Sequence, residues 1–147
     1  MSSEVPSVAV DIPVLEAWRR LSETKTTILI DVRTRAEWSF VGVPDLATLG
    51  KQTVLVEWLG FPDNRPNSNF VAELTERLGT LGAAKDAELL FICRSGARSQ
   101  LAAQAMMRAG YTRCFNVAEG FEGPLDDARH RGVRSGWKAQ SLPWLQG

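Results

Sequence analysis

The sequence predicts a single domain of the α/β class, and two observations lead to this class. Apolar runs of strand length alternate along the chain with amphipathic stretches in which every third or fourth residue is apolar. The chain has 147 residues, of which 44% are hydrophobic, enough for one sizeable core. We therefore expect one compact domain over residues 1–147, with its core at about residues 8–145, and exclude a disordered or fibrous chain.

The charge balance and the cysteine content exclude several function classes. Because 17 Lys and Arg residues balance 17 Asp and Glu residues, no overall field draws the molecule to nucleic acid or to an anionic membrane, and we expect neither as a partner. Two cysteines and one histidine are too few for a disulfide scaffold, or for a zinc site without carboxylates. The N-terminal residues have neither the basic region nor the long apolar run typical of a leader peptide, and no apolar run reaches membrane-spanning length. We therefore expect a soluble, cytoplasmic protein.

Five apolar runs are the candidate strands, and three stretches of helical period are the candidate helices. The strands are expected at residues 8–10, 28–32, 54–58, 89–93 and 114–117. Pro13 suits the first turn of the first helix, an Asn or Ser cap at 67–69 begins the second, and Gly110 ends the third. The expected inward faces, in chain order, are Ile12, Leu15, Trp18 and Leu21; Phe70, Val71, Leu74 and Leu78; and Leu101, Ala105, Met106 and Ala109.

Two long segments have no clear period. Residues 39–66 hold three prolines and three glycines around one short strand, which predicts a long, partly ordered connection. Residues 124–136 are mostly polar and predict an exposed loop. The aromatic residues after it, Trp137 and Trp144, predict a C-terminal end that docks on the core.

The segment that joins the fourth apolar run to the third helix carries the candidate chemistry. Cys93 ends the strand, and ligands of α/β sheets bind where strands end and the following helices begin. The helix dipole, the loop amides, Arg94 and Arg98 would all favour a Cys93 thiolate. Gly96 would let the loop curl, and Ser99 would offer a hydroxyl or cap backbone donors. The candidate active loop comprises Cys93, Arg94, Ser95, Gly96, Ala97, Arg98 and Ser99.

Two other interpretations of this loop are less consistent with the sequence. An inert core cysteine would not have two arginines and a glycine in the next five residues, because burying cations without an anion is costly. Cysteine phosphatases and arsenate reductases place five residues between cysteine and arginine, whereas four separate Cys93 from Arg98. The shorter loop suits one additional sulfur atom better than a phosphoryl group.

Several motifs together resemble a single-domain rhodanese, over nearly the whole chain from about residue 8. The matching segments are Asp31-Val-Arg33, the active loop, Asn-Val-Ala-Glu-Gly-Phe at 116–121, and Trp137 with Leu142-Pro143. The resemblance implies a three-layer α/β/α rhodanese-like domain with a five-stranded parallel sheet, in which the second and fourth strands are adjacent.

The resemblance also implies a sulfurtransferase. The Cys93 thiolate would take the outer sulfur of thiosulfate, release sulfite and hold a persulfide until a thiol or cyanide removes it. Arg94 would attract the sulfonate, and Arg98 would hold the loop and add positive potential; two arginines favour thiosulfate over mercaptopyruvate as the small sulfur-containing anion donor. We expect no metal and no organic cofactor, and the thiol acceptor could be borne by a protein.

Two alternatives keep the fold and change the function. The domain could be a persulfide carrier that serves a protein partner, or a non-catalytic interaction module. An intact Cys93 counts against the module, because degenerate members of the family typically lose that cysteine.

Asp31 and Arg33 follow the second strand, which in a rhodanese adjoins the strand that leads to Cys93. We expect a scaffold: Asp31 would pair with an arginine or with loop amides, and Arg33 with Glu37. The alternative is a solvated surface pair of little energetic value. Cys114 is expected to be a small core residue rather than a resolving thiol.

The sequence departs from the family after Asp31-Val-Arg33. The family commonly has Gly-His-Ile-Pro-Gly-Ala there, whereas residues 41–46 read Val-Gly-Val-Pro-Asp-Leu. The missing histidine and the long connection imply an altered rim. Trp38, Trp58 and Phe61 could line this rim, and ordinary packing is the alternative for each.

Overall fold

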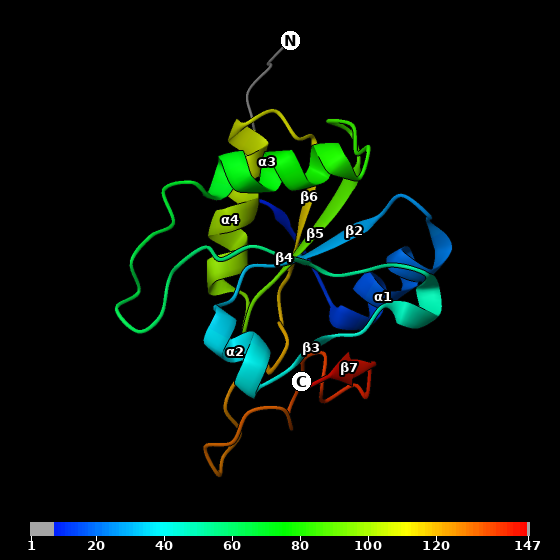
Figure 1. The fold of residues 1–147 in the computed structure, drawn as a ribbon. Helices are drawn as coiled ribbons and strands as arrows, with labels where there is room; N and C mark the ends of the chain where they lie inside the picture. The colour runs from blue at the N-terminus through cyan, green and yellow to red at the C-terminus, as the bar shows by residue number, and fades with distance from the viewer. Residues whose placement is uncertain (1–7, 147) are drawn as a thin grey trace.

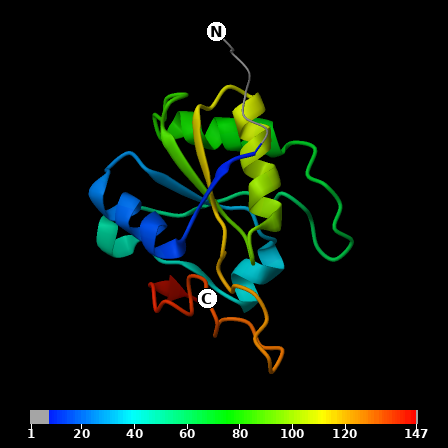
Figure 2. The same ribbon diagram turned by 180° about the vertical axis from the view of Figure 1, so that it is seen from behind.

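The computed structural model describes residues 8–146 and has the three-layer α/β/α architecture expected from the resemblance (Figures 1 and 2). Five parallel strands form the central sheet in the order β1-β6-β5-β2-β4. Their bounds are β1 (Val10–Ile12), β2 (Ile28–Asp31), β4 (Val54–Leu55), β5 (Glu88–Ile92) and β6 (Arg113–Val117). The second and fourth of these strands along the chain, β2 and β5, are neighbours, which confirms the expected topology.

Helices cover both faces of the sheet (Figures 1 and 2). α3 (Phe70–Thr80) and α4 (Ala97–Arg108) pack on one face, and α1 (Val14–Glu23) packs on the other with the C-terminal segment. The remaining elements are α2 (Arg35–Phe40), the short 3-10 helix η1 (Ala47–Leu49), and a small antiparallel sheet of β3 (Val43–Pro44) and β7 (Trp144–Leu145). Among residues 8–146, no helix is long and apolar enough to cross a membrane.

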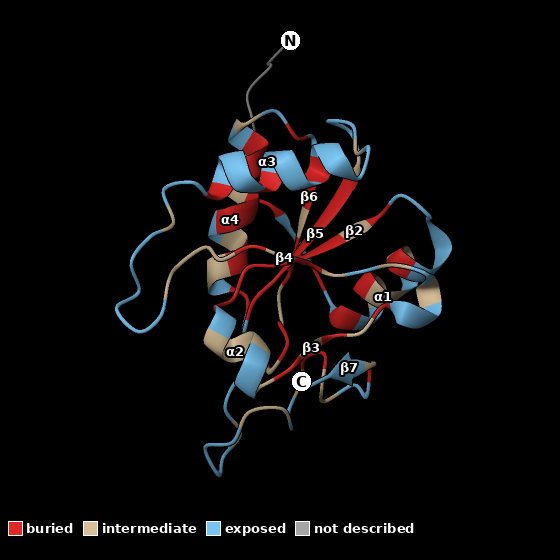
Figure 3. Cartoon of the chain, in the orientation of Figure 1, coloured by how far each residue is buried: buried red, intermediate tan, exposed pale blue. Residues whose placement is uncertain are grey.

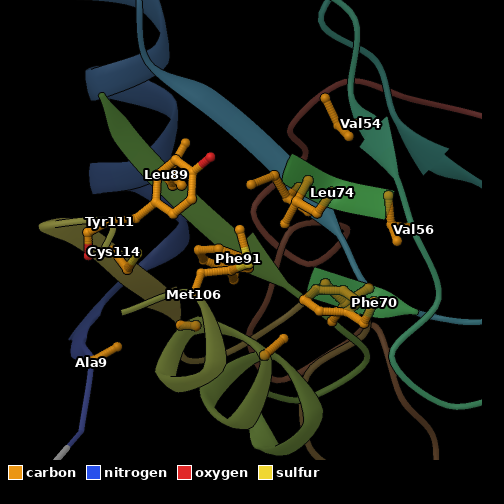
Figure 4. Close-up of a cluster of buried hydrophobic side chains, with 14 of the residues drawn as sticks. Ala9, Val54, Val56, Phe70, Leu74, Leu89, Phe91, Met106, Tyr111 and Cys114 are labelled. Carbon is orange, nitrogen blue, oxygen red and sulfur yellow. Dashed lines mark hydrogen bonds between the residues drawn. The ribbon is translucent and has the colours of Figure 1, made fainter. Parts of the chain in front are cut away.

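β5 lies at the centre of the sheet and is buried along its whole length. Leu89 and Phe91 contribute to the core beneath α3 and α4, which Figure 4 shows in close-up. Leu90 and Ile92 contribute to the core on the α1 side. Because both faces of this strand are covered, all of its residues after Glu88 are apolar. The apolar run at residues 89–93 predicted the strand to within one residue at each end.

Parts of the predicted helix faces were wrong. Each helix has an exposed outer side, drawn pale blue in Figure 3, and some residues predicted to face inward lie there. Leu15 of α1, Val71 of α3 and Leu101 of α4 are exposed. Ile12 is buried, but it belongs to β1, and Pro13 is the residue before the first turn of α1. The buried face of α4 includes Ser99, Ala102, Ala103, Ala105, Met106 and Met107, so small residues allow this helix to approach the sheet closely and leave Leu101 outside.

The connection predicted to be irregular contains several ordered elements. β3, η1 and β4 lie within residues 39–66, and α2 begins just before that segment. α2 begins with a capping box: the Glu37 N–H donates to Thr34 Oγ1 (3.2 Å), and the Thr34 N–H donates to Glu37 Oε1 (3.1 Å). The Thr-x-x-Glu spacing was a usable local signal for this helix. Residues 124–136 contain no helix or strand, as expected.

Candidate active site

Cys93 follows the last residue of β5, and its sulfur lies inside the loop that leads into α4. The side chain is buried, and the backbone N–H groups of Gly96 (3.1 Å) and Ser99 (3.4 Å) donate to its Sγ. The N–H groups of Ala97 and Arg98 lie in the first turn of α4, where a helix offers them no acceptor. The loop therefore presents several hydrogen-bond donors around one sulfur, which favours a negative charge there.

Glycine is required at position 96. Its φ of +105° lies in a region that other residues rarely adopt, and a Cβ at this position would collide with the backbone carbonyl of Ala118. The same sharp turn carries the Gly96 N–H toward Cys93 Sγ. The sequence interpretation, that Gly96 lets the loop curl, agrees with this geometry.

The segment after β6 supports the loop from outside. The Phe121 N–H donates to the carbonyl of Cys93 (2.8 Å), and the N–H groups of Glu122 and Gly123 both donate to the carbonyl of Arg94 (3.0 Å each). Gly120 has a φ of +72°, and a Cβ there would lie 2.7 Å from the Cys93 carbonyl oxygen. The motif at residues 116–121 indicated the family resemblance, but nothing in the sequence indicated that it supports the loop.

The two arginines of the loop have different surroundings. Arg98 forms a bidentate ion pair with Glu37 of α2, with N–O distances of 2.7 and 2.9 Å. Arg94 is exposed and forms no ion pair with any residue in the described range 8–146. Glu37 offsets part of the Arg98 charge, although Arg98 still interacts electrostatically with Cys93. Arg94 is the loop arginine whose charge is open to a substrate.

The Glu37–Arg98 pair is held in its charged form. Burial alone would raise the pKa of Glu37. The hydrogen bonds and charge of Arg98, together with the hydrogen bonds from Thr34, outweigh burial and lower this pKa to about 2. The hydrogen bonds that Arg98 donates to Glu37 raise the pKa of Arg98, and the nearby Cys93 and Asp31 act in the same direction. This pair connects α2 to the first turn of α4.

Asp31 and Arg33 are both fully buried, which rules out a solvated surface pair. Arg33 Nε and Nη2 donate to the Asp31 carboxylate, the shortest contact being 2.6 Å, and Nη2 also donates to the Gly42 carbonyl (2.7 Å). The guanidinium lies over the ring of Phe121, 4.3 Å from its centroid. Asp31 pairs with an arginine as expected, but the predicted Arg33–Glu37 pair was wrong, because Glu37 is taken by Arg98.

Sequence reasoning missed Asn116 as a site residue. Its Oδ1 accepts a hydrogen bond from the hydroxyl of Ser99 (2.6 Å). Its Nδ2 donates to the Gly96 carbonyl (3.2 Å) and to Asp11 Oδ1 (2.9 Å). The Ser99 hydroxyl also lies 3.2 Å from Cys93 Sγ. Asn116 is thus one hydrogen bond away from the sulfur, on β6 beside β5.

Cys114 is buried far from the loop. It pairs in register with Leu89, four residues before Cys93 along β5, a separation of about 13 Å at the usual rise of a strand. Burial raises the pKa of the Cys114 thiol to about 12. Figure 4 shows Cys114 beside Tyr111 in the core, as the sequence predicted. The separation along β5 puts it out of reach for a resolving thiol.

The aromatic residues suggested for the rim have separate positions. Trp58 packs edge-to-face on Phe70, with ring centroids 5.0 Å apart, and belongs to the core. Trp38 is half-buried on α2, whereas Phe61 is largely exposed. Ordinary packing therefore describes Trp58.

A cavity of about 800 Å³ opens at the other end of the strands. Its walls include Thr27, Ile28 and Ala87, which precede or begin β2 and β5, and none of the described residues that line it belongs to the loop at 93–99. Since Cys93 lies at the carboxyl end of β5, this cavity is not part of the candidate active site.

Comparison with known proteins agrees with the architecture. A family model described as "STR4 middle domain", a family of rhodanese-like domains, matches residues 12–147. The chain belongs to this family. The rhodanese-like domain is also 35% identical over 130 residues to the uncharacterized protein RP600 of Rickettsia prowazekii, covering 88% of this chain and 91% of that protein.

Two further proteins are similar to the rhodanese-like domain. The crystal structure of Rv0390 from M. tuberculosis superposes with a TM-score of 0.86 at 48% identity, covering 96% of this chain and 100% of that chain. A protein of Allochromatium vinosum named "Sulfurtransferase" is 28% identical over 102 residues, covering 69% of this chain and 75% of that protein. The domain is therefore related to the rhodanese-like sulfurtransferases.

Proposed function

We propose that this rhodanese-like domain is a sulfurtransferase that moves sulfane sulfur from a donor such as thiosulfate to a thiol or cyanide through a persulfide on Cys93. The observation that carries the proposal is the position of Cys93 Sγ, buried at the end of β5 with the N–H groups of Gly96 and Ser99 directed at it. Such donors suit a sulfur nucleophile that is anionic before the reaction.

The reaction has two displacements at sulfur. The Cys93 thiolate attacks the outer sulfur of thiosulfate, a new S–S bond forms, and the S–S bond of thiosulfate breaks so that sulfite leaves with the electron pair. Cyanide then attacks the outer sulfur of the persulfide, thiocyanate leaves, and the Cys93 thiolate is regenerated. The two half-reactions balance without a metal or an organic cofactor.

The residues of the loop have separate roles in this scheme. The exposed guanidinium of Arg94 attracts the anionic donor and stabilises the departing sulfite. The amides at the start of α4 stabilise charge on the outer sulfur of the persulfide. Arg98, paired with Glu37, holds α4 in place, and Asp31 with Arg33 supports the adjoining strand end.

A persulfide carrier for a protein partner is the second candidate. It is favoured by the pairing of Arg98 with Glu37, which leaves Arg94 as the open arginine of the loop for a small dianion. In this alternative, another protein supplies the sulfur and thiosulfate turnover is incidental.

Intact mass separates the two candidates. The protein is treated with thiosulfate, its mass is measured, and cyanide is then added while thiocyanate is followed. A gain of about 32 Da, one sulfur atom, that is lost to cyanide with repeated turnover supports the enzyme. A gain without repeated turnover supports the carrier.

Two variants assign the modified residue. Cys93→Ser should gain no mass, and the matched variant Cys114→Ser should behave like the unaltered protein, because Cys114 is buried in the core away from the loop. Mass gain in Cys93→Ser, or no gain in the unaltered protein with any sulfane donor, would contradict the proposal.

A further inference from the structure

The orientation of the Asn116 side-chain amide is determined by its neighbours. Its Nδ2 lies 2.9 Å from a carboxylate oxygen of Asp11 and 3.2 Å from the carbonyl oxygen of Gly96. Both neighbours only accept hydrogen bonds, so the NH₂ group must face them. The amide oxygen, Oδ1, is thereby directed at Ser99.

This orientation decides how the hydroxyl of Ser99 uses its hydrogen. The hydroxyl has one hydrogen and three acceptors within reach: Asn116 Oδ1 (2.6 Å), Cys93 Sγ (3.2 Å) and the Gly96 carbonyl (3.3 Å). The contact with Asn116 is the shortest, and a buried amide oxygen without a donor would be costly. Ser99 therefore donates to Asn116 and turns its lone pairs toward Cys93.

We infer that Asn116 is a positioning residue that keeps the Ser99 hydrogen away from Cys93. In the protonated form of Cys93, the Ser99 hydroxyl then accepts the thiol hydrogen. When Cys93 releases its proton to solvent, the sulfur anion and Asn116 compete for the hydrogen of Ser99, and the backbone N–H groups of Gly96 and Ser99 remain as donors in either case.

Asn116 thus sets the balance between thiol and thiolate through Ser99. The inference concerns the nucleophile of the proposed function, but its test measures protonation and does not require sulfur transfer. The charged groups around the sulfur stay in place in the test variants. They are Arg94 of the loop, Arg98 with Glu37 of α2, and Asp31 with Arg33 at the end of β2.

The test is a double-mutant cycle read by thiolate absorbance near 240 nm at one fixed pH, with Cys93→Ser as the blank. Cys114 does not contribute at neutral pH, because its pKa is about 12. Asn116→Ala should raise the thiolate-to-thiol ratio of Cys93 about threefold, because the Ser99 hydroxyl becomes free to donate to sulfur. In a Ser99→Ala background, the same Asn116→Ala change should have no effect.

Two outcomes would overturn the inference. Either Asn116→Ala leaves the ratio unchanged, or it changes the ratio equally with and without the Ser99 hydroxyl, which would indicate a general disturbance of the loop. If Asn116→Ala does not fold, Asp11→Ala gives a related test from an exposed position. The loss of the Asp11 charge acts equally with and without Ser99, so only the part of the change that requires Ser99 tests the inference. The variant removes one of the two acceptors of Asn116 Nδ2, so it should raise the ratio more when Ser99 is present than when it is replaced by alanine.

Discussion

At the scale of single residues, the site depends on positions that only glycine can occupy. Gly96 combines a positive φ with the near contact of Ala118, so both backbone conformation and space exclude other residues. Gly82 also has a positive φ, +73°, but a Cβ there would have nothing within 4 Å. The two glycines separate the effect of backbone strain from the effect of the collision.

Gly96→Ala should destabilise the fold by about 3 kcal/mol and abolish mass gain from thiosulfate, because the loop must move away from Ala118 and take the Gly96 N–H from the sulfur. Gly82→Ala should cost about 1 kcal/mol, the strain of its φ alone. Urea unfolding and intact mass measure the two effects. Equal losses of unfolding free energy in the two variants would show that the collision with Ala118 does not contribute to the cost of Gly96→Ala.

At the scale of elements, the Glu37–Arg98 pair joins α2 to α4, and its energy depends on pH. The folded pKa of Glu37, about 2, lies below its ordinary value of 4.5. The stabilisation is therefore complete above pH 4.5 and is lost as pH falls toward 2. Glu16 also has a pKa lowered to about 2, through hydrogen bonds from Arg19 and then Arg20, but it lies on the exposed surface of α1.

Glu37→Gln should flatten the fall in unfolding free energy between pH 4.5 and 2, removing about 2 kcal/mol of pH-dependent stability. Glu16→Gln is the matched control, and its effect should be small and should disappear in added salt. Urea unfolding at a series of pH values gives both slopes. An unchanged slope in Glu37→Gln would mean that the pair does not persist in solution.

At the scale of the whole molecule, the C-terminal segment is part of the core. Trp137 is completely buried, its Nε1 donates to the carbonyl of Pro143 (2.7 Å), and its ring packs edge-to-face on Trp18 at 5.8 Å. Its backbone N–H donates to the carbonyl of Gly120, in the segment that supports the active loop. The end of the chain therefore stabilises both α1 and the surroundings of Cys93.

Trp137→Ala should lower the unfolding free energy by about 4 kcal/mol, because it opens a large cavity between α1 and the sheet. Trp144 is 40% exposed, and Trp144→Ala should cost roughly 1 kcal/mol. Urea unfolding at neutral pH compares the two variants. Similar costs would contradict the packing described for Trp137.

Much of the fold was predictable because its signals are local. A continuous apolar run indicates a doubly covered strand whatever its neighbours are, so residues 89–93 predicted β5. The helix faces were less predictable, because Val71 and Leu101 have the right spacing, and only the actual placement of α3 and α4 on the sheet leaves them exposed.

The sequence by itself determined the candidate nucleophile and its loop, since Cys93 to Ser99 are contiguous and their chemistry follows from a strand end and a helix start. Only the tertiary structure decided which residues form ion pairs and hydrogen bonds with each other around the site. Glu37 and Arg98 are 61 positions apart, and Asp11 and Asn116 are 105 apart, so they meet only when the elements pack together. Each charged or polar group pairs with the partner that packing brings within hydrogen-bonding distance, and spacing along the chain does not contain that information.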